Sequence, residues 1–163
     1  DLQRQLFDKL NTDSVLAGLL SPAKSKVGKI TRVSFNQATN ELFENGFFHN
    51  KDIETIFRGV KNFLQAAEIV FMNSKSEKAK LTNSILFRAI FAIFNEVVDK
   101  CLRNYSDFKV ESIVNILDPI SKINFDGYTG TSNATYSKVV SDMRKELNEY
   151  NKRYINLNSE NIF

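Results

Sequence analysis

Two long segments in the middle of the chain place apolar residues three and four positions apart, which is the spacing of one face of an α-helix. The first segment starts near Asn50 and carries Ile53, Ile56, Phe57, Val60, Phe63, Leu64, Ala67, Val70 and Phe71. The second covers about 82–103 and carries Phe87, Ile90, Phe91, Phe94, Val97, Val98 and Cys101. We expect two long helices whose phenylalanine-lined faces pack against each other.

The second segment is apolar around most of its circumference. Beside its main stripe it carries Ile85, Leu86, Ala89, Ala92 and Ile93. A helix that is apolar on nearly every side packs against neighbours on several sides. We therefore expect this segment to form one central helix of the fold.

Shorter helical patterns precede these two segments. Residues 2–10 show apolar positions at helical spacing, namely Leu2, Leu6, Phe7 and Leu10. Four residues of types that cap helices follow at 11–14 and indicate a break. One or two further helical turns are expected over 15–20, ending before Pro22, because the residue before a proline disfavours the helical conformation.

A helix is also expected from Ser34 to about Asn45. Ser34 and Gln37 match the capping box, in which the Ser hydroxyl and the Gln amide each satisfy a free backbone N–H group. Gly46 then stands where a left-handed residue commonly follows the end of a helix.

The C-terminal part of the chain predicts two helices separated by polar links. The first covers about 107–117, and Asp118-Pro119 then suits an N-cap followed by proline at the first position of a short new turn. A loop rich in Gly, Asp, Thr and Ser is expected over 125–133. The closing helix, over about 134–154, is expected to bury Tyr136, Val139, Val140, Met143, Leu147 and Tyr150.

Together these patterns predict an all-α fold, an irregular bundle of five to seven helices. The 163 residues fit one domain, and 42% hydrophobic with 25% charged residues is typical of globular chains. Because the chain opens at Asp1 rather than at methionine, we expect 1–163 to be a single helical domain of a longer protein. No apolar run approaches the ~18–20 residues that cross a bilayer, and no signal peptide is visible, which favours a cytoplasmic location and no membrane partner.

The chain carries one cysteine, Cys101, and one histidine, His49. Cys101 lies on a buried stripe, where cysteine is held as an unreactive thiol, and a lone cysteine forms no internal disulfide. These two residues cannot supply the ligands of an ordinary zinc site. The sequence therefore predicts no catalytic, cofactor-binding or metal-binding residues. It leaves open that the chain is the helical part of an enzyme whose active site lies outside it.

The strongest candidate surface is the segment 21–32, which we expect to be an exposed basic loop with a short extended piece at 30–33. Its cations are Lys24, Lys26, Lys29 and Arg32. No acidic residue occurs between Asp13 and Glu41, so these charges lack local compensation and suit phosphate contacts that weaken with salt. A loop that is merely solvated is the alternative interpretation. The net charge of +3 is too balanced to indicate nucleic acid by itself.

A second candidate is the loop that precedes the closing helix, where Gly127 and Gly130 stand among Asp, Thr and Ser. Backbone amides at such a helix start are suited to holding an anion. A plain connecting loop is the alternative interpretation.

Four stretches of the chain, in their order, resemble a known family. They are Gly28–Phe35, Phe63–Ala67, Leu86–Phe91 and Leu117–Phe125, the last followed by a Gly-containing loop and a closing helix. This order resembles the C-terminal helical part of the DGQHR-domain proteins, a group that includes the DndB-like proteins of DNA phosphorothioate modification. The resemblance implies an accessory helical domain of a DNA-associated protein in modification, defence or mobile-element biology. The Asp-Gly-Gln-His-Arg motif itself is absent here, so the resemblance transfers no site residue.

The leading hypothesis is therefore a non-catalytic helical domain that contacts DNA phosphates through the basic loop. The second hypothesis is a protein-interaction or oligomerisation module. Its anchors would be aromatic side chains that we expect to be exposed, drawn from Phe47, Phe48, Tyr128 and Tyr154. Neither hypothesis requires a cofactor.

Overall fold

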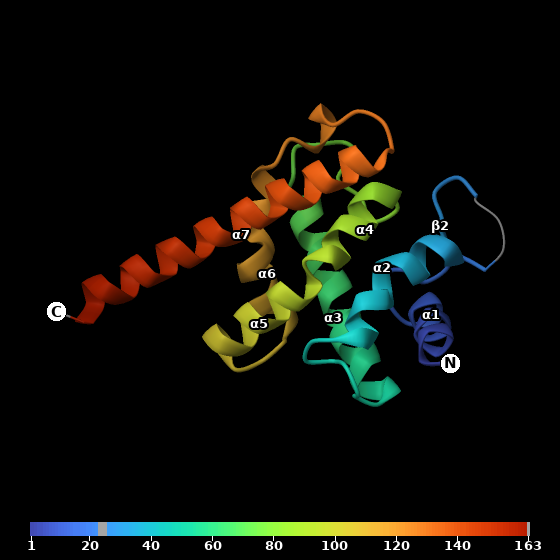
Figure 1. The fold of residues 1–163 in the computed structure, drawn as a ribbon, viewed down its shortest axis with the longest axis horizontal. Coiled ribbons are helices and arrows are strands. Elements are labelled where there is room, and N and C mark those ends of the chain that lie inside the picture. Colours follow the sequence, from blue (N-terminus) through green and yellow to red (C-terminus); the bar gives the residue numbers. More distant parts are fainter. Residues whose placement is uncertain (23–25, 163) are drawn as a thin grey trace.

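The structure, a computed structural model, describes residues 1–22 and 26–162, and it describes their side chains as far as Asn148. Seven α-helices account for most of this part of the chain (Figure 1): α1 (Leu2–Thr12), α2 (Arg32–Glu44), α3 (Ile53–Met72), α4 (Ser84–Ala92), α5 (Phe94–Tyr105), α6 (Val110–Leu117) and α7 (Asn133–Ile162). Two 3-10 helices, Asp118–Lys122 and Phe125–Gly127, lie between α6 and α7, and two short strands, β1 (Leu20–Ser21) and β2 (Ile30–Thr31), lie between α1 and α2. The expected all-α irregular bundle is confirmed.

The long helix α3 runs through the middle of the bundle and is contacted by α1 and α6 (Figure 1). The residues of its predicted stripe are buried from Ile56 to Phe71 with the exception of Phe57. Phe57 and Ile53 are half-buried. Asp52 caps the helix, because its carboxylate accepts the N–H of Thr55 at 2.8 Å. On the other side of the bundle α4 lies between α2 and α7, and α5 packs against α6.

Phenylalanine rings form a continuous chain of contacts through the core. The ring of Phe63 in α3 lies 5.6 Å from that of Phe91 and 4.8 Å from that of Phe94, so the two phenylalanine-lined faces do meet. The contacts continue on one side through Phe87, Phe35 and Phe7, and on the other through Phe48 and Phe108. Edge-to-face and tilted pairs at such distances stabilise the core beyond the burial of apolar area.

The prediction of one helix over 82–103 is wrong, because the structure divides this segment at Ile93. α4 ends at Ala92, Ile93 adopts φ −99° and ψ 5°, and α5 begins at Phe94. The two halves have different neighbours, since α4 packs against α2 and α7 while α5 packs against α6. A straight helix cannot follow both sets of neighbours. The turn at the fully buried Ile93 lets each half bury its own apolar face.

The N-terminal predictions are partly wrong. In α1 the side chains of Leu6, Phe7 and Leu10 are buried as expected, but Leu2 is exposed. The predicted helical turns over 15–20 are absent from the structure, which shows non-helical turns followed by β1. Backbone pairing explains this outcome, because Leu20 is held in extended conformation beside Ile30.

The capping box predicted at Ser34 is also wrong, because α2 begins at Arg32. Thr31 is the N-cap, and its hydroxyl accepts the N–H of Ser34 at 3.1 Å. The helix starts early because β2 places Thr31 in extended backbone immediately before it. The other end agrees with the prediction, since Gly46 follows α2 with φ +88°.

The C-terminal predictions hold in most respects. α6 starts at Val110, and Pro119 lies in the first turn of the next 3-10 helix. The N-cap of that helix is Leu117, so the prediction that Asp118 is the N-cap is wrong. The predicted inner face of α7 is buried at Val139, Val140, Met143 and Leu147. Tyr136 is half-buried, and Tyr150 lies outside the residues whose side chains are described. Across the described part of the chain, no helix is both long enough and apolar enough to pass through a bilayer.

Candidate functional site

The basic loop begins at β1 and ends at β2, and these two paired strands form its base. The two strands pair in parallel, with Leu20 opposite Ile30 and Ser21 opposite Thr31. Leu20 and Ile30 are both buried in the core, and the N–H of Ile30 donates to the carbonyl of Leu19 at 2.8 Å. Both ends of the loop are therefore fixed on the bundle.

Asn11, at the end of α1, binds the segment that leads into β1. Its side-chain oxygen accepts the N–H of Gly18 at 3.0 Å and that of Leu20 at 3.2 Å. Its amide group donates to the carbonyl of Leu20 at 3.4 Å. The side chain of Asn11 thus adds to the backbone hydrogen bonds of these non-helical turns, in which the N–H of Gly18 also donates to the carbonyl of Asn11 at 3.1 Å.

The tip of the loop is a tight turn from Lys26 to Lys29. The N–H of Lys29 donates to the carbonyl of Lys26 at 3.1 Å, and Gly28 adopts φ +75°. Positive φ at the third residue is typical of a type II turn, and glycine adopts it without steric cost. Figure 1 shows this turn, which we call the arch, standing clear of the helices, above α2.

The structure places the four predicted cations in unequal surroundings. Lys26 and Lys29 are exposed, and neither makes an ion pair with an acidic group of the described residues. Arg32 differs, because its guanidinium lies 4.2 Å from the centre of the Phe7 ring and the residue is half-buried in the first turn of α2. Lys24 lies outside the described residues. The structure therefore brings Lys26 and Lys29 together at the tip and assigns Arg32 to packing on α1.

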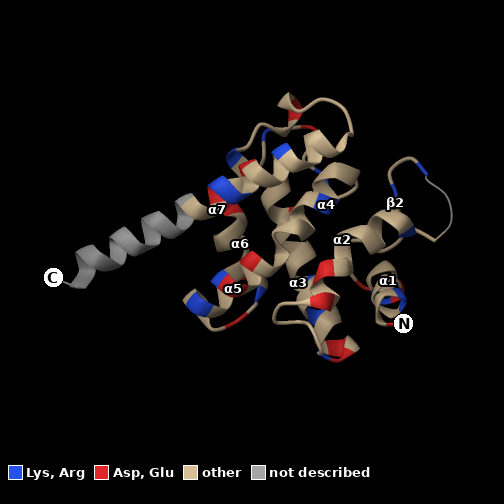
Figure 2. Ribbon diagram, viewed as in Figure 1, with Lys and Arg blue, Asp and Glu red and all other residues tan. Residues whose placement is uncertain are grey.

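The arch carries only positive charge. Figure 2 shows basic segments on it and no acidic segment, as expected from the absence of Asp and Glu between Asp13 and Glu41. Some basic side chains elsewhere pair with acidic ones, as in Lys9–Glu54 at 2.8 Å. The loop tip is thus a small uncompensated positive surface.

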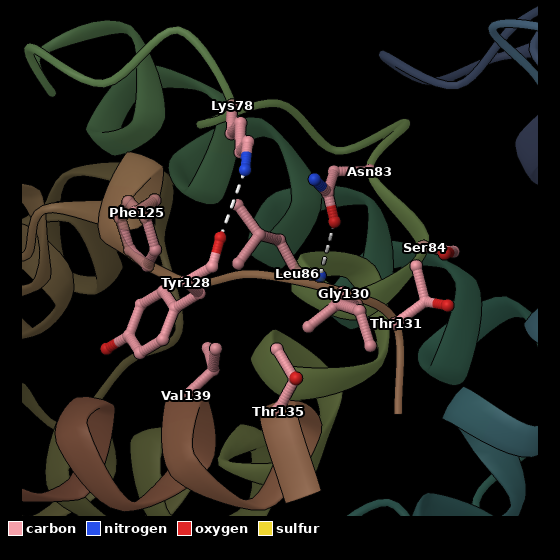
Figure 3. Close-up of a pocket in the computed structure, with 11 residues that line it drawn as sticks. Lys78, Asn83, Ser84, Leu86, Phe125, Tyr128, Gly130, Thr131, Thr135 and Val139 are labelled. Carbon is pink, nitrogen blue, oxygen red and sulfur yellow. Dashed lines mark hydrogen bonds between the residues drawn. The ribbon is translucent and has the colours of Figure 1, made fainter. Parts of the chain in front are cut away.

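The second region of interest is a cavity of about 300 Å³ between the start of α4 and the start of α7 (Figure 3). Its apolar wall is formed by Leu86, Phe125 and Val139, and Thr135 adds a hydroxyl from α7. Lys78 reaches over the cavity, a residue that no sequence motif singled out. Its ammonium donates to the carbonyl of Tyr128 at 3.0 Å.

Three polar side chains around this cavity, those of Lys78, Asn83 and Thr135, already have partners inside the protein. Asn83 caps α4 by accepting the N–H of Leu86 at 3.1 Å. In the glycine-containing loop, a candidate for anion binding, the Ser132 hydroxyl accepts the N–H of Thr135 at 3.2 Å, so a side chain occupies part of the start of α7. These contacts favour the plain connecting loop.

The connection between α3 and α4 is docked onto this region. The Asp126 carboxylate accepts the N–H groups of Lys78 and Glu77, each at 3.0 Å. These two backbone hydrogen bonds, that of Lys78 first, hold the pKa of Asp126 below its ordinary value. Ser76 adds a contact, because its hydroxyl accepts the N–H of Phe125 at 2.9 Å. The cavity therefore lies beside two segments, 76–78 and 123–128, that are hydrogen-bonded to each other.

The single cysteine and the single histidine differ in exposure to solvent. Cys101 is fully buried, as predicted, and burial raises the pKa of its thiol to about 12, which makes it a poor nucleophile. His49 is exposed in the turn after α2. Among the described residues, no group of three or more His, Cys, Asp or Glu side chains is placed to hold a metal ion.

The aromatic anchors expected for a protein interaction are mostly committed to the fold. Phe48 is buried, so the prediction that it is exposed is wrong. It packs against Gly59 of α3, where a Cβ atom would lie only 2.3 Å from the ring. Tyr128 is half-buried and donates its hydroxyl to Asp142. Phe47 is 47% exposed, and the side chain of Tyr154 lies outside the described part.

Comparison of the chain with models of protein families, with curated protein sequences and with solved structures gives no match.

Proposed function

We propose that this chain is a non-catalytic helical domain that binds DNA through its basic loop, with Lys26 and Lys29 on the phosphates. The main support for the proposal is that both lysines are exposed and make no ion pair with the described residues. They flank a protruding turn whose base is fixed by β1 and β2, and no acidic side chain of the described residues neutralises them. Because both ends of the loop are held by the paired strands, it loses less conformational entropy on binding than a free segment would, and more of the energy of the charge contacts goes into affinity.

The number of phosphate contacts sets how steeply binding falls with salt. Each contact with duplex DNA contributes about −0.9 to the slope of log K against log salt concentration. Two contacts, from Lys26 and Lys29, predict about a tenfold loss of affinity between 50 and 200 mM salt. Four contacts, including Lys24 and Arg32, predict roughly a hundredfold loss. Because Arg32 packs on Phe7, we expect a dependence shallower than that of four contacts.

Two contacts alone give weak, sequence-independent binding, which suits an accessory domain in a longer DNA-associated protein. The resemblance of four stretches of the chain to the C-terminal part of DGQHR-domain proteins supports the same role in DNA modification or defence. The parent reading frame upstream of Asp1 tests this part of the proposal. An Asp-Gly-Gln-His-Arg motif encoded there supports it, and an unrelated upstream domain contradicts it.

DNA binding itself is tested by fluorescence anisotropy of a labelled duplex over a salt series. We expect the double variant K26A/K29A to lose most of the affinity at 50 mM salt and most of the salt dependence, with an unchanged thermal unfolding midpoint. The matched control is K109A/K122A, which removes two charges from exposed lysines outside the loop. Absence of binding by the unaltered chain at 50 mM salt, or equal loss in both double variants, contradicts the proposal.

A further inference from the structure

The basic turn carries an apolar side chain, that of Val27, which is not packed into the core of the described residues. Val27 is 105% exposed, the highest value among the large apolar residues that are exposed in the described structure. Single exposed apolar residues are common on protein surfaces. This one is unusual in its place, since it stands between Lys26 and Lys29 in the turn that their backbone hydrogen bond closes.

We propose that Val27 contacts the 5-methyl group of pyrimidines in the major groove of duplex DNA, while Lys26 and Lys29 hold the flanking phosphates. This inference rests on the proposed function, because it specifies what the loop contacts once it lies on DNA. In the major groove the thymine methyl is the apolar feature of the base edges, and apolar side chains are its usual partners. The branched side chain of Val27 is stiff at χ1, so little rotamer freedom is lost on contact.

The width of the turn selects the groove. The hydrogen bond from Lys29 to Lys26 at 3.1 Å closes a four-residue turn, and the ends of such a turn lie within about 7 Å of each other. With side chains added, the tip is wider than the minor groove of about 6 Å, whereas the major groove of about 12 Å admits a two-stranded ribbon. The arch therefore fits the groove that displays the methyl group.

A membrane surface is the other partner that an apolar residue among lysines suggests. Stable attachment to a bilayer needs a large apolar face or a second anchoring signal. The described tip offers one valine beside a glycine and two lysines, which is too little apolar area. On DNA the phosphates supply the affinity, so one apolar contact is enough to add a preference. The observations therefore favour DNA.

The test compares three duplexes of equal length and charge by fluorescence anisotropy at 50 mM salt. The first contains thymine, the second has uracil at every thymine position, and the third keeps uracil and replaces cytosine by 5-methylcytosine. Loss of one methyl contact is expected to weaken binding of the unaltered chain about fourfold, from ≈ 0.8 kcal/mol per buried methylene. The third duplex is expected to recover the affinity, because 5-methylcytosine places a methyl group on the same edge of its base.

The variant V27S is expected to bind all three duplexes equally and to keep its salt dependence. V33S is the matched control, since Val33 is also exposed, at 65%, but lies in α2 beyond the turn. An unaltered chain that does not distinguish the duplexes, or V27S that still does, overturns the inference while the lysine variants continue to test the proposed function separately. Tighter binding to vesicles of anionic lipid than to any duplex, lost in V27S, overturns it in favour of a membrane. Absence of DNA binding at 50 mM salt overturns both proposals.

Discussion

Two lysine-rich connections of this protein are similar as sequences and different as structures. Residues 21–31 contain Lys24, Lys26 and Lys29, and residues 73–83 contain Lys75, Lys78 and Lys80. The first connection is fixed only at its base and projects a turn away from the bundle (Figure 1). The second is bound to the segment 123–128 through Ser76, Glu77 and Lys78.

The difference lies in what each connection meets. In the second, Asp126 accepts two backbone N–H groups, Ser76 bonds to Phe125, and the ammonium of Lys78 bonds to the carbonyl of Tyr128. In the first, Lys26 and Lys29 meet no acidic partner among the described residues. A count of lysines therefore does not indicate which of them are available to a ligand. The partner segment decides, and here it lies almost fifty residues away in the sequence.

The docking of the second connection depends on Phe125, and its loss is the largest effect that we expect. Phe125 is buried and its ring lies 5.7 Å from that of Phe71 in an edge-to-face pair. F125A removes a large side chain from the core and is expected to lower the free energy of unfolding by about 3–5 kcal/mol in urea denaturation. F47A is the control, because Phe47 is 47% exposed. Equal losses in the two variants would show that the connection is not anchored by Phe125.

An intermediate effect is expected at the base of the first connection. N11A removes the acceptor for the N–H groups of Gly18 and Leu20 and leaves them without side-chain partners. We expect unfolding free energy to fall by about 1–3 kcal/mol and DNA affinity to fall with it, because the turn is no longer held in place. The neighbouring variant T12A, which removes an exposed hydroxyl bonded to the carbonyl of Asp8, should change neither quantity appreciably. DNA affinity that survives N11A would mean that the fixed base is unimportant.

The smallest effect is expected from the pH dependence of the docked connection. The hydrogen bonds from Lys78 and Glu77 keep the pKa of Asp126 in the folded protein below the ordinary 3.8. Its contribution to stability is therefore present above about pH 4 and is lost as pH falls through the lowered pKa. D126N should be less stable than the unaltered chain at neutral pH, and the gap should narrow as the pH falls below about 4. Urea midpoints measured at several pH values check this, with D118N as a control at an exposed aspartate. A gap that widens on acidification would contradict the assignment.

Local patterns in the sequence were sufficient for most of the fold. The stripe from Ile56 to Phe71 predicted the buried face of α3, and the stripe from Val139 to Leu147 predicted that of α7. These predictions succeed because helical spacing and burial are properties of a few neighbouring residues. The exposed position of Lys26 and Lys29 agrees with the basic loop that the cations of 21–32 predicted.

The failures share one cause, which is competition from distant segments. The apolar stripe from Phe87 to Cys101 is continuous, yet the helix divides at Ile93 because its two halves pack on different neighbours. Phe48 was expected to be exposed, yet it packs against Gly59, where the missing side chain leaves room for its ring.

The sequence by itself thus determined that the chain is helical, which faces are apolar and where uncompensated lysines occur, because each follows from composition and spacing over a few turns. The tertiary structure decided which of the described basic side chains remain available to a ligand. Arg32 is drawn onto Phe7 and Lys78 onto Tyr128, whereas Lys26 and Lys29 are carried outward on a turn that short parallel pairing holds in place. The physical reason is that a cation's availability depends on the rings, carbonyls and carboxylates that folding brings within a few ångströms of it, and these come from distant parts of the chain.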